Sequence, residues 1–287
     1  MSQRPATPDP ESLWLPGMSG QLAALSMGAN SGHSILALHG WLDNAASFIP
    51  LAEMLPEQHF VALEFPGHGH SDHRPSGTVY HFADYVADVA HAVRGLDWQR
   101  FTLMGHSLGA NVALVFAATF PELVNRLILI DGVGPTSGSA DQAVARLRRS
   151  VDAGCAPEMS PRRHYDDWAS LLKARQYASP ISAASAELLV RRGAREVNGA
   201  IQMRSDRRLR QPSPLYLQES VVNAFVRAIR APVLLILAED GVIGGRQATR
   251  QRITLFEDIE VRELPGQHHL HMDDPAAVAQ VIEAFCG

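Results

Sequence analysis

One pentapeptide constrains the fold of this chain more than any other feature: Gly-His-Ser-Leu-Gly at residues 105–109. An apolar run at residues 101–104 precedes it, and an alanine-rich stretch of helical character follows it. Gly-x-Ser-x-Gly between a strand and a helix is typical of a strained turn that exposes the serine hydroxyl. A side chain at Gly105 or Gly109 would collide with neighbouring backbone. Ser107 is therefore the candidate nucleophile, and a serine-capped tight turn is the structural alternative.

The composition is that of an ordinary globular protein. Of the 287 residues, 46% are hydrophobic and 19% charged, which suffices for one large core. A net charge of −5 and a pI of about 6.2 do not favour nucleic acid or an anionic membrane as partner. Cys155 and Cys286 lie far apart, without metal-ligand spacing. With no signal-peptide pattern in the proline-rich residues 1–10 and no apolar run near the roughly 18 residues of a membrane span, we expect a cytoplasmic protein with a frayed N-terminal tail.

Strand-like and helix-like segments alternate along most of the chain, which predicts βαβ units and a mainly parallel sheet. The predicted strands are residues 35–39, 60–64, 101–104, 127–130, 233–238 and 260–264. The predicted helices are residues 48–55 and 80–96, the stretch after Ser107, and a final helix that begins at Asp274 and Pro275.

The alternation stops for about 80 residues after Asp131. A structureless loop of that length is improbable inside a compact domain, and helical patches occur near residues 140–151 and 183–195. Residues 134–212 also carry an excess of arginine, whereas the rest of the chain is acidic. We therefore predict a core of residues 1–133 and 213–287, with residues 134–212 (the inserted segment) as a helical lid over the sheet.

The serine needs a base, because its hydroxyl is a weak nucleophile until its proton is removed. Functional groups of α/β sheets lie at the carboxyl ends of strands, and Leu-Pro-Gly-Gln-His at residues 264–268 follows the last predicted strand. His268 follows the Pro-Gly turn most directly and is the candidate base. His269 and His271 are its competitors.

Two histidine-rich segments raise the question of a metal site. The first segment, at residues 268–273, offers His268, His269, His271 and Asp273 as candidate metal ligands, but it holds no ligand pair at helical i, i+4 spacing. The second segment offers His68, His70 and His73, which we expect to pack within a loop. We predict neither a metal nor a cofactor.

An oxyanion formed at the serine needs two N–H donors. One is expected from the backbone of Leu108, the residue after the nucleophile. The other is expected from the backbone of Trp41 in His-Gly-Trp at residues 39–41, where Gly40 allows close approach. The acid that orients the histidine is either Asp131, at the end of one predicted strand, or Asp240, at the end of the next.

Together these motifs resemble the α/β-hydrolase superfamily. More narrowly, His-Gly-Trp-Leu-Asp-Asn-Ala at residues 39–45 and Arg-Ser-Asp-Arg-Arg-Leu at residues 204–209 resemble the serine-hydrolase-like (kraken-type) proteins, which are related in sequence to haloalkane dehalogenases and epoxide hydrolases. The resemblance implies an α/β-hydrolase fold: an eight-stranded, mainly parallel sheet flanked by helices, with a helical cap inserted after the sixth strand. Dehalogenases with their acid after the sixth strand carry it where Asp131 stands, which favours Asp131 over Asp240.

The chain departs from those two enzyme groups at the nucleophile, where they carry aspartate. Alkyl transfer to Ser107 would leave an ether that water cannot cleave at an acyl carbon, whereas an acyl-serine is hydrolysable. We therefore expect a serine hydrolase that cleaves carboxylic esters, including thioesters or lactones, of a small-molecule acyl substrate. The alternatives are hydrolysis of a carbon–carbon bond in a diketone, and a non-catalytic module that binds a small ligand. Against the second alternative stand Ser107, His268 and the two candidate acids.

Overall fold

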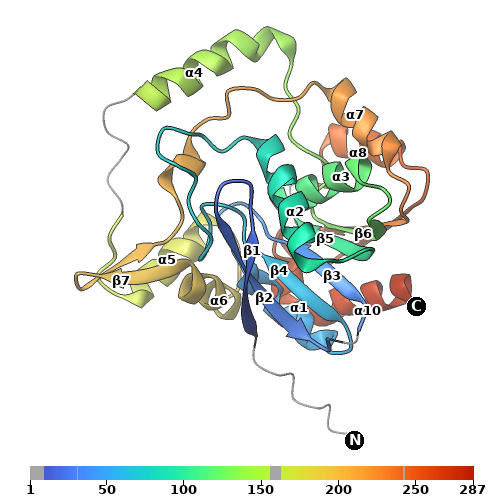
Figure 1. Ribbon diagram of the computed structural model, residues 1–287, viewed down its shortest axis with the longest axis horizontal. Coiled ribbons are helices and arrows are strands. Elements are labelled where there is room, and N and C mark those ends of the chain that lie inside the picture. Colours follow the sequence, from blue (N-terminus) through green and yellow to red (C-terminus); the bar gives the residue numbers. More distant parts are fainter. Residues whose placement is uncertain (1–9, 31, 156–162, 242) are drawn as a thin grey trace, which may run out of the picture.

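The computed structural model describes residues 10–30, 32–155, 163–241 and 243–287. The expected N-terminal tail lies, through residue 9, outside the described residues. The centre of the molecule is an eight-stranded sheet with the order β1-β2-β4-β3-β5-β6-β9-β10 (Figure 1). The strands are β1 (Glu11–Pro16), β2 (Gln21–Gly28), β3 (Ser34–Leu38), β4 (His59–Leu63), β5 (Phe101–His106), β6 (Val124–Ile130), β9 (Val233–Ala238) and β10 (Ile259–Leu264).

The sheet is parallel from β4 to β10, and β2 pairs antiparallel with both β1 and β4. Strand β5 is buried along its whole length, as expected for a central parallel strand covered on both faces. Because parallel strands end at the same edge, β3, β5, β6, β9 and β10 bring the segments that follow them together there. The predicted eight-stranded, mainly parallel sheet is confirmed.

Helices cover both faces of the sheet. On one face α2 (Phe82–Leu96), α3 (Leu108–Thr119), α7 (Glu219–Ala228) and α8 (Gln247–Ile253) contribute to one apolar cluster. On the other face α1 (Ile49–Met54), after the short 3₁₀ turn η1 (Ala45–Phe48), packs with α9 (Leu270–Asp273) and α10 (Pro275–Cys286). Helix α3 is apolar on nearly all sides because it lies between the sheet and the helices α2 and α7.

Between β6 and α7 the chain leaves the sheet. It forms η2 (Ala140–Gln142), α4 (Ala143–Cys155), α5 (Trp168–Ala178), α6 (Ala183–Gly193), the hairpin β7 (Ala194–Val197) and β8 (Ala200–Met203), and η3 (Arg207–Arg210). This segment has a small apolar cluster of its own, made of Leu171, Val190, Ala194 and Ile201. The β7–β8 hairpin differs from the purely helical segment predicted from the sequence. Among the described residues, no helix is both long and apolar enough to cross a lipid bilayer.

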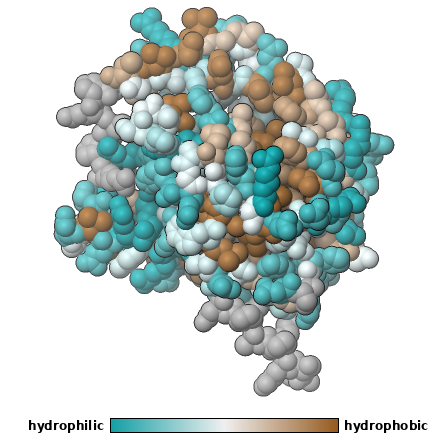
Figure 2. Space-filling model, in the orientation of Figure 1, coloured by the Kyte–Doolittle hydropathy of each residue, from teal (hydrophilic) through white to brown (hydrophobic). Residues whose placement is uncertain are grey.

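Helix α4 is the least packed part of the inserted segment. It lies apart from the sheet in Figure 1, and Arg146 is its one buried residue among those described. Val144, Leu147 and Val151 remain exposed, and Figure 2 shows hydrophobic surface at that end of the molecule. The inserted segment is held on the core instead by α5, α6 and the residues around η3, where Arg208 donates to the backbone carbonyl oxygens of Arg74, Pro75 and Thr78.

Two buried carboxylates of the core hold α5 and α6 in place. Glu64, which is fully buried, accepts two hydrogen bonds from Arg192 of α6, at 2.7 Å from Nε and 3.2 Å from an Nη. Asp43 accepts one at 2.8 Å from an Nη of Arg175 of α5. Since both carboxylates lie in loops that follow core strands, the inserted segment and the sheet edge are one connected structure.

Replacing Arg192 with alanine is expected to destabilise the protein by about 3–5 kcal/mol, because it leaves the buried carboxylate of Glu64 without its counter-charge. Arg191 is a matched control, since it pairs with Glu187 where both side chains are more than half exposed. We expect Arg191→Ala to cost less than about 1 kcal/mol. Urea unfolding of both variants measures the difference, and equal losses would contradict this account of the Glu64–Arg192 pair.

Candidate active site

The turn between β5 and α3 has the geometry expected for an exposed serine. Ser107 has φ 52° and ψ −112°, a region that non-glycine residues adopt only at a cost of about 1–3 kcal/mol. A Cβ at Gly105 would lie 2.3 Å from the carbonyl oxygen of Gly109, and one at Gly109 would lie 1.9 Å from that of Leu38. Both glycines are therefore required for α3 to start directly against the ends of β5 and β3.

His268 and Asp131 are in direct contact. Nδ1–H of His268 donates to Oδ2 of Asp131 at 2.5 Å, and Asp131 is fully buried. This hydrogen bond fixes the tautomer with its free lone pair on Nε2, and the described residues give Nε2 no hydrogen-bond partner. The imidazole is thus arranged to accept a proton on the side away from Asp131.

Asp240 does not take part in this contact. Its side chain is exposed, and its backbone N–H donates to the carbonyl oxygen of Gly266 at 3.1 Å. Asp240 therefore helps to position the turn that leads to His268, and the structure brings Asp131, not Asp240, to the imidazole.

Ser107 and Asp131 line the same cavity, of about 200 Å³ (the inner cavity). The ring of His268 lies 4.6 Å from the ring of His106, the residue before Ser107. The three residues predicted as nucleophile, base and acid, which the sequence separates widely, are thus gathered at the carboxyl ends of β5, β6 and β10.

The loop that follows β3 carries the second predicted oxyanion donor. Gly40 packs closely, since a Cβ there would lie 2.9 Å from both Nδ1 of His106 and Oδ2 of Asp43. Trp41 donates its indole N–H to the carbonyl oxygen of Leu209 at 3.2 Å, so its ring is held by the inserted segment. Leu108 is the first residue of α3, where the backbone N–H groups have no acceptor within the helix.

The inserted segment also holds the rest of this loop. Asn44 donates from Nδ2 to the carbonyl oxygen of Leu189 in α6 at 2.9 Å, while its Oδ1 caps η1 by accepting from Ala46 N–H. Burial opposes ionisation of Asp43, but the hydrogen bond with His269 and the charge of Arg175 outweigh it and hold its pKa well below the usual value. The backbone at residues 39–44 is thus fixed from the side of α5 and α6.

Two further histidine rings, those of His106 and His269, contact the ring of His268. Nε2–H of His106 donates to the backbone carbonyl oxygen of His268 at 2.8 Å, so the residue before Ser107 positions the candidate base. Nε2 of His269 lies 3.1 Å from Oδ2 of Asp43. Neither His106 nor Asp43 was predicted to have a role, although both stand inside motifs that indicate the fold, at residues 105–109 and 39–45.

Among the described residues, one group of three side chains lies close enough together to hold a metal ion, but it is neither of the two histidine-rich segments considered from the sequence. Ligand atoms of Asp43, His106 and His269 lie within 4.8 Å of one another. An Nη of Arg175 lies 2.8 Å from Oδ1 of Asp43 and 3.2 Å from Nε2 of His269. Because this guanidinium already supplies a positive charge at the group, the residues present do not suit a divalent cation.

Buried histidines make the stability depend on pH. Burial lowers the pKa of His271 to about 3, and among the described residues neither ring nitrogen has a hydrogen-bond partner. The folded protein therefore binds fewer protons than the unfolded chain between about pH 3 and the unperturbed value near 6.5. Above pH 6.5 protonation of His271 does not reduce the free energy of unfolding. As the pH falls from about 6.5 to about 3, the free energy of unfolding decreases by up to ~1.4 kcal/mol per pH unit.

Replacing His271 with leucine is expected to weaken this pH dependence. An apolar side chain of similar volume needs no hydrogen bonds, so the change costs little at neutral pH. At lower pH the wild-type histidine is protonated in the unfolded chain but not in the folded protein, which favours unfolding, and leucine removes this effect. The test compares urea midpoints of the wild type and His271→Leu at about pH 7.5 and about pH 5.5. An equal loss on acidification in both proteins would contradict the prediction.

Known proteins share both the sequence pattern and this architecture. A family model described as the alpha/beta hydrolase fold matches residues 34–275. The serine hydrolase-like protein of Danio rerio is 33% identical over 93% of this chain and 85% of its own length. Serine hydrolase-like protein 2 of Homo sapiens is also 33% identical, over 93% of this chain and 90% of its own.

Among solved structures, a hypothetical protein of Pseudomonas aeruginosa superimposes with a TM-score of 0.91 at 41% identity, over 96% of this chain and 99% of that one. The thioesterase domain from the curacin biosynthetic pathway superimposes with a TM-score of 0.87 at 24% identity, over 96% of this chain and 100% of that one, and shows the fold alone. The chain belongs to the α/β-hydrolase family. Within it, the curated relatives just described are serine hydrolase-like proteins, and fold and relatives together identify a hydrolase, as predicted.

Proposed function

We propose that the protein is a serine hydrolase that cleaves carboxylic esters, including thioesters or lactones, through an acyl-serine intermediate. The observation that carries the proposal is the contact of His268 with the buried Asp131, at a cavity that Ser107 and Asp131 line together. A buried carboxylate bound to Nδ1–H of a histidine is the arrangement that holds an imidazole as a base toward a serine.

In the proposed acylation, Oγ of Ser107 attacks the ester carbonyl carbon and Nε2 of His268 takes the hydroxyl proton. Asp131 stabilises the imidazolium that forms. The tetrahedral intermediate collapses by breaking the bond to the leaving oxygen or sulfur, to which His268 passes the proton. Water then attacks the acyl-serine, with His268 again taking and returning a proton, and the acid and free Ser107 result.

The backbone N–H groups of Trp41 and Leu108 are the proposed donors to the oxyanion. Leu108 is suited to this role by its place at the start of α3, where the helix dipole also favours negative charge. The loop of Trp41 is suited because its neighbours Asp43 and Asn44 are fixed by hydrogen bonds. Preorganised donors need no rearrangement when the charge develops, and losing one typically costs about 10²–10³ in rate.

We propose further that the inserted segment, residues 134–212, is a cap that helps to build the site. Its helices supply Arg175 of α5 to the buried carboxylate of Asp43, within the Trp41 loop, and Arg192 of α6 to that of Glu64. Its own apolar cluster supports its description as a unit distinct from the core of residues 1–133 and 213–287.

The proposal is tested with p-nitrophenyl esters from acetate to laurate. We expect saturable turnover of the short esters, which would support an ester hydrolase. No turnover of any ester would contradict the proposed activity.

A further inference from the structure

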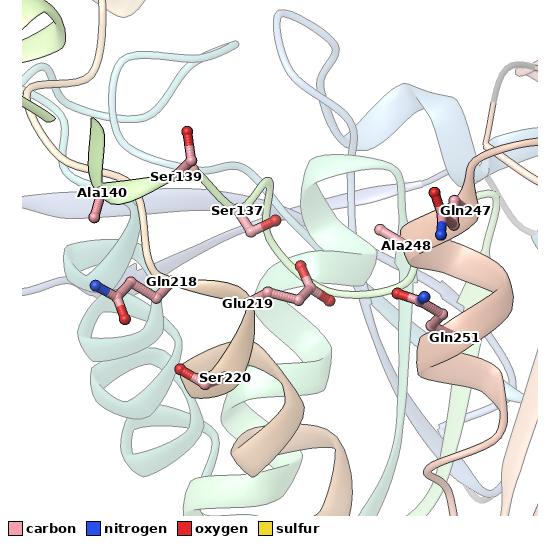
Figure 3. A pocket seen from close by; sticks show the side chains of 10 residues that line it. Ser137, Ser139, Ala140, Gln218, Glu219, Ser220, Gln247, Ala248 and Gln251 are labelled. Atoms are coloured by element: carbon pink, nitrogen blue, oxygen red, sulfur yellow. The ribbon is translucent and has the colours of Figure 1, made fainter. Parts of the chain in front are cut away.

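A second hollow adjoins the inner cavity. The outer groove, of about 610 Å³, lies where the chain leaving β6 passes the first residues of α7 and α8 (Figure 3). Ser137 and Ala248 line both the groove and the inner cavity, so the two hollows meet at these residues. A molecule held at Ser107 would reach the outer groove at this shared boundary of Ser137 and Ala248 (the neck).

The outer groove is built before any ligand arrives. Ser137 forms a parallel bridge with Leu217, and Gly138 N–H donates to the carbonyl oxygen of Leu217 at 3.0 Å. Arg252 donates to the carbonyl oxygens of Val133 and Gly134 at 2.7 and 3.1 Å. These bonds fix the wall of the groove against α8, and binding there requires little ordering of the chain.

The lining of the groove combines apolar surface with hydroxyl and amide groups and offers no uncompensated charge. Among the described residues that line it, Glu219 alone is ionisable, and both of its carboxylate oxygens accept from Arg252, at 2.8 and 2.7 Å. Figure 3 shows the side chains of Glu219 and Gln251 directed toward each other. The hydroxyl and amide side chains of the lining are Ser137, Ser139, Gln218, Ser220, Gln247 and Gln251. Amides and hydroxyls both donate and accept, so they match uncharged groups that do the same.

A buried polar atom in the inner cavity points to the same chemistry. Oδ1 of Asn111 is buried and, within the described residues, has no hydrogen-bond partner, and Asn111 lines the inner cavity. A buried amide oxygen without a donor is costly. Whichever way the amide is turned, a polar group of a bound molecule would satisfy it, whereas an alkyl chain would not.

The topology indicates which part of an ester extends into the groove. The Trp41 loop follows β3 on one side of β5, whereas residues 131–137 follow β6 and α8 follows β9 on the other side. His268, after β10, also lies on this second side. The leaving group must receive its proton from His268, so it lies on the side of the inner cavity and outer groove.

We propose that the substrate's leaving group is an uncharged arm of amide and hydroxyl groups, which passes from Ser107 through the neck at Ser137 and Ala248 into the outer groove. This inference rests on the proposed ester hydrolysis and names its substrate class. The groove has room for roughly twenty non-hydrogen groups at about 30 Å³ each. A long arm can therefore be held along much of its length.

The kinetic test uses two acetyl thioesters that differ in the arm alone, S-acetyl-N-acetylcysteamine and the longer S-acetylpantetheine. We expect kcat/KM of the wild type to be at least about tenfold higher for the long arm, which corresponds to about 1.4 kcal/mol. Ala248→Trp fills the neck and is expected to bring the ratio of the two kcat/KM values to near one. Arg250→Trp is the matched control, because Arg250 is exposed on the same helix and does not line the groove. It is expected to keep the wild-type ratio.

A binding test separates the groove from the activity. Ser107→Ala protein is titrated with panthenol, an uncharged amide alcohol, and with pantothenate, its anionic counterpart, by saturation-transfer NMR. We expect panthenol to bind more tightly than pantothenate, and Ala248→Trp in the same background to abolish that binding. If panthenol binds but no ester is hydrolysed, the groove is a binding site for such an arm and the proposed ester hydrolysis is wrong. Hydrolysis of both thioesters at equal kcat/KM, or panthenol binding unaffected by Ala248→Trp, would overturn the groove.

Discussion

Ser107→Ala is expected to lower kcat for p-nitrophenyl acetate by on the order of 10⁵–10⁶-fold, the loss found when a serine nucleophile of this kind is removed. Alanine has no oxygen to form the acyl-enzyme, and His268 and the oxyanion donors cannot replace that bond. The backbone strain at φ 52° is the same for alanine as for serine, so the variant should unfold at the wild-type temperature. The measurement is initial rate at saturating ester, beside a melting curve.

Ser170→Ala is the control for this experiment. Ser170 is an exposed serine on α5, and its backbone N–H donates to Oδ1 of Asp167. We expect it to retain wild-type turnover. Turnover by Ser107→Ala within tenfold of the wild type, in a folded protein, would contradict Ser107 as nucleophile.

Asp131→Asn is expected to lower kcat by about 10⁴-fold at neutral pH, with little change in KM. The asparagine amide can turn its NH₂ toward Nδ1 of His268, where the carboxylate now accepts at 2.5 Å. The imidazole would then carry its proton on Nε2 and could no longer act as a base toward Ser107. The measurement is kcat as a function of pH, compared with the wild type.

Asp240→Asn decides between the two acids considered from the sequence. Its carboxylate is exposed, and within the described residues it makes no hydrogen bond to His268, so we expect a change in kcat of less than about threefold, in line with the small effects of exposed charges. If Asp240→Asn lost more activity than Asp131→Asn, the assignment of the acid would be wrong.

Much of the sheet could be predicted because its parallel strands are short apolar runs between glycine, proline and helical patterns. β9 begins and ends at the predicted residues, β10 begins one residue earlier than predicted, and β3 and β4 are each shifted by one residue toward the N-terminus. The strands β1 and β2 went unpredicted. They pair antiparallel at the edge of the sheet, where polar residues such as Ser12 and Gln21 interrupt the apolar pattern.

The chemistry of the site was predictable where local geometry demands particular residues, and not where it depends on distant contacts. The elbow at Ser107 requires Gly105 and Gly109 within a few residues, so a short motif reveals it. The contact of Arg175 with Asp43 joins residues 132 positions apart and two segments of different composition. The sequence does not predict this pair, because the contact depends on how α5 packs against the Trp41 loop in the folded protein.

Trapping the acyl-enzyme would show directly whether Ser107 is the nucleophile. Wild-type protein is mixed with p-nitrophenyl acetate, quenched in acid within the first turnover, digested and examined by mass spectrometry, while the release of p-nitrophenolate is followed in parallel. An acyl-serine mechanism predicts a burst of about one p-nitrophenolate per protein and one acetyl group on the peptide that contains Ser107. Steady turnover with no acetylated peptide, or acetyl on a residue other than Ser107, would contradict it.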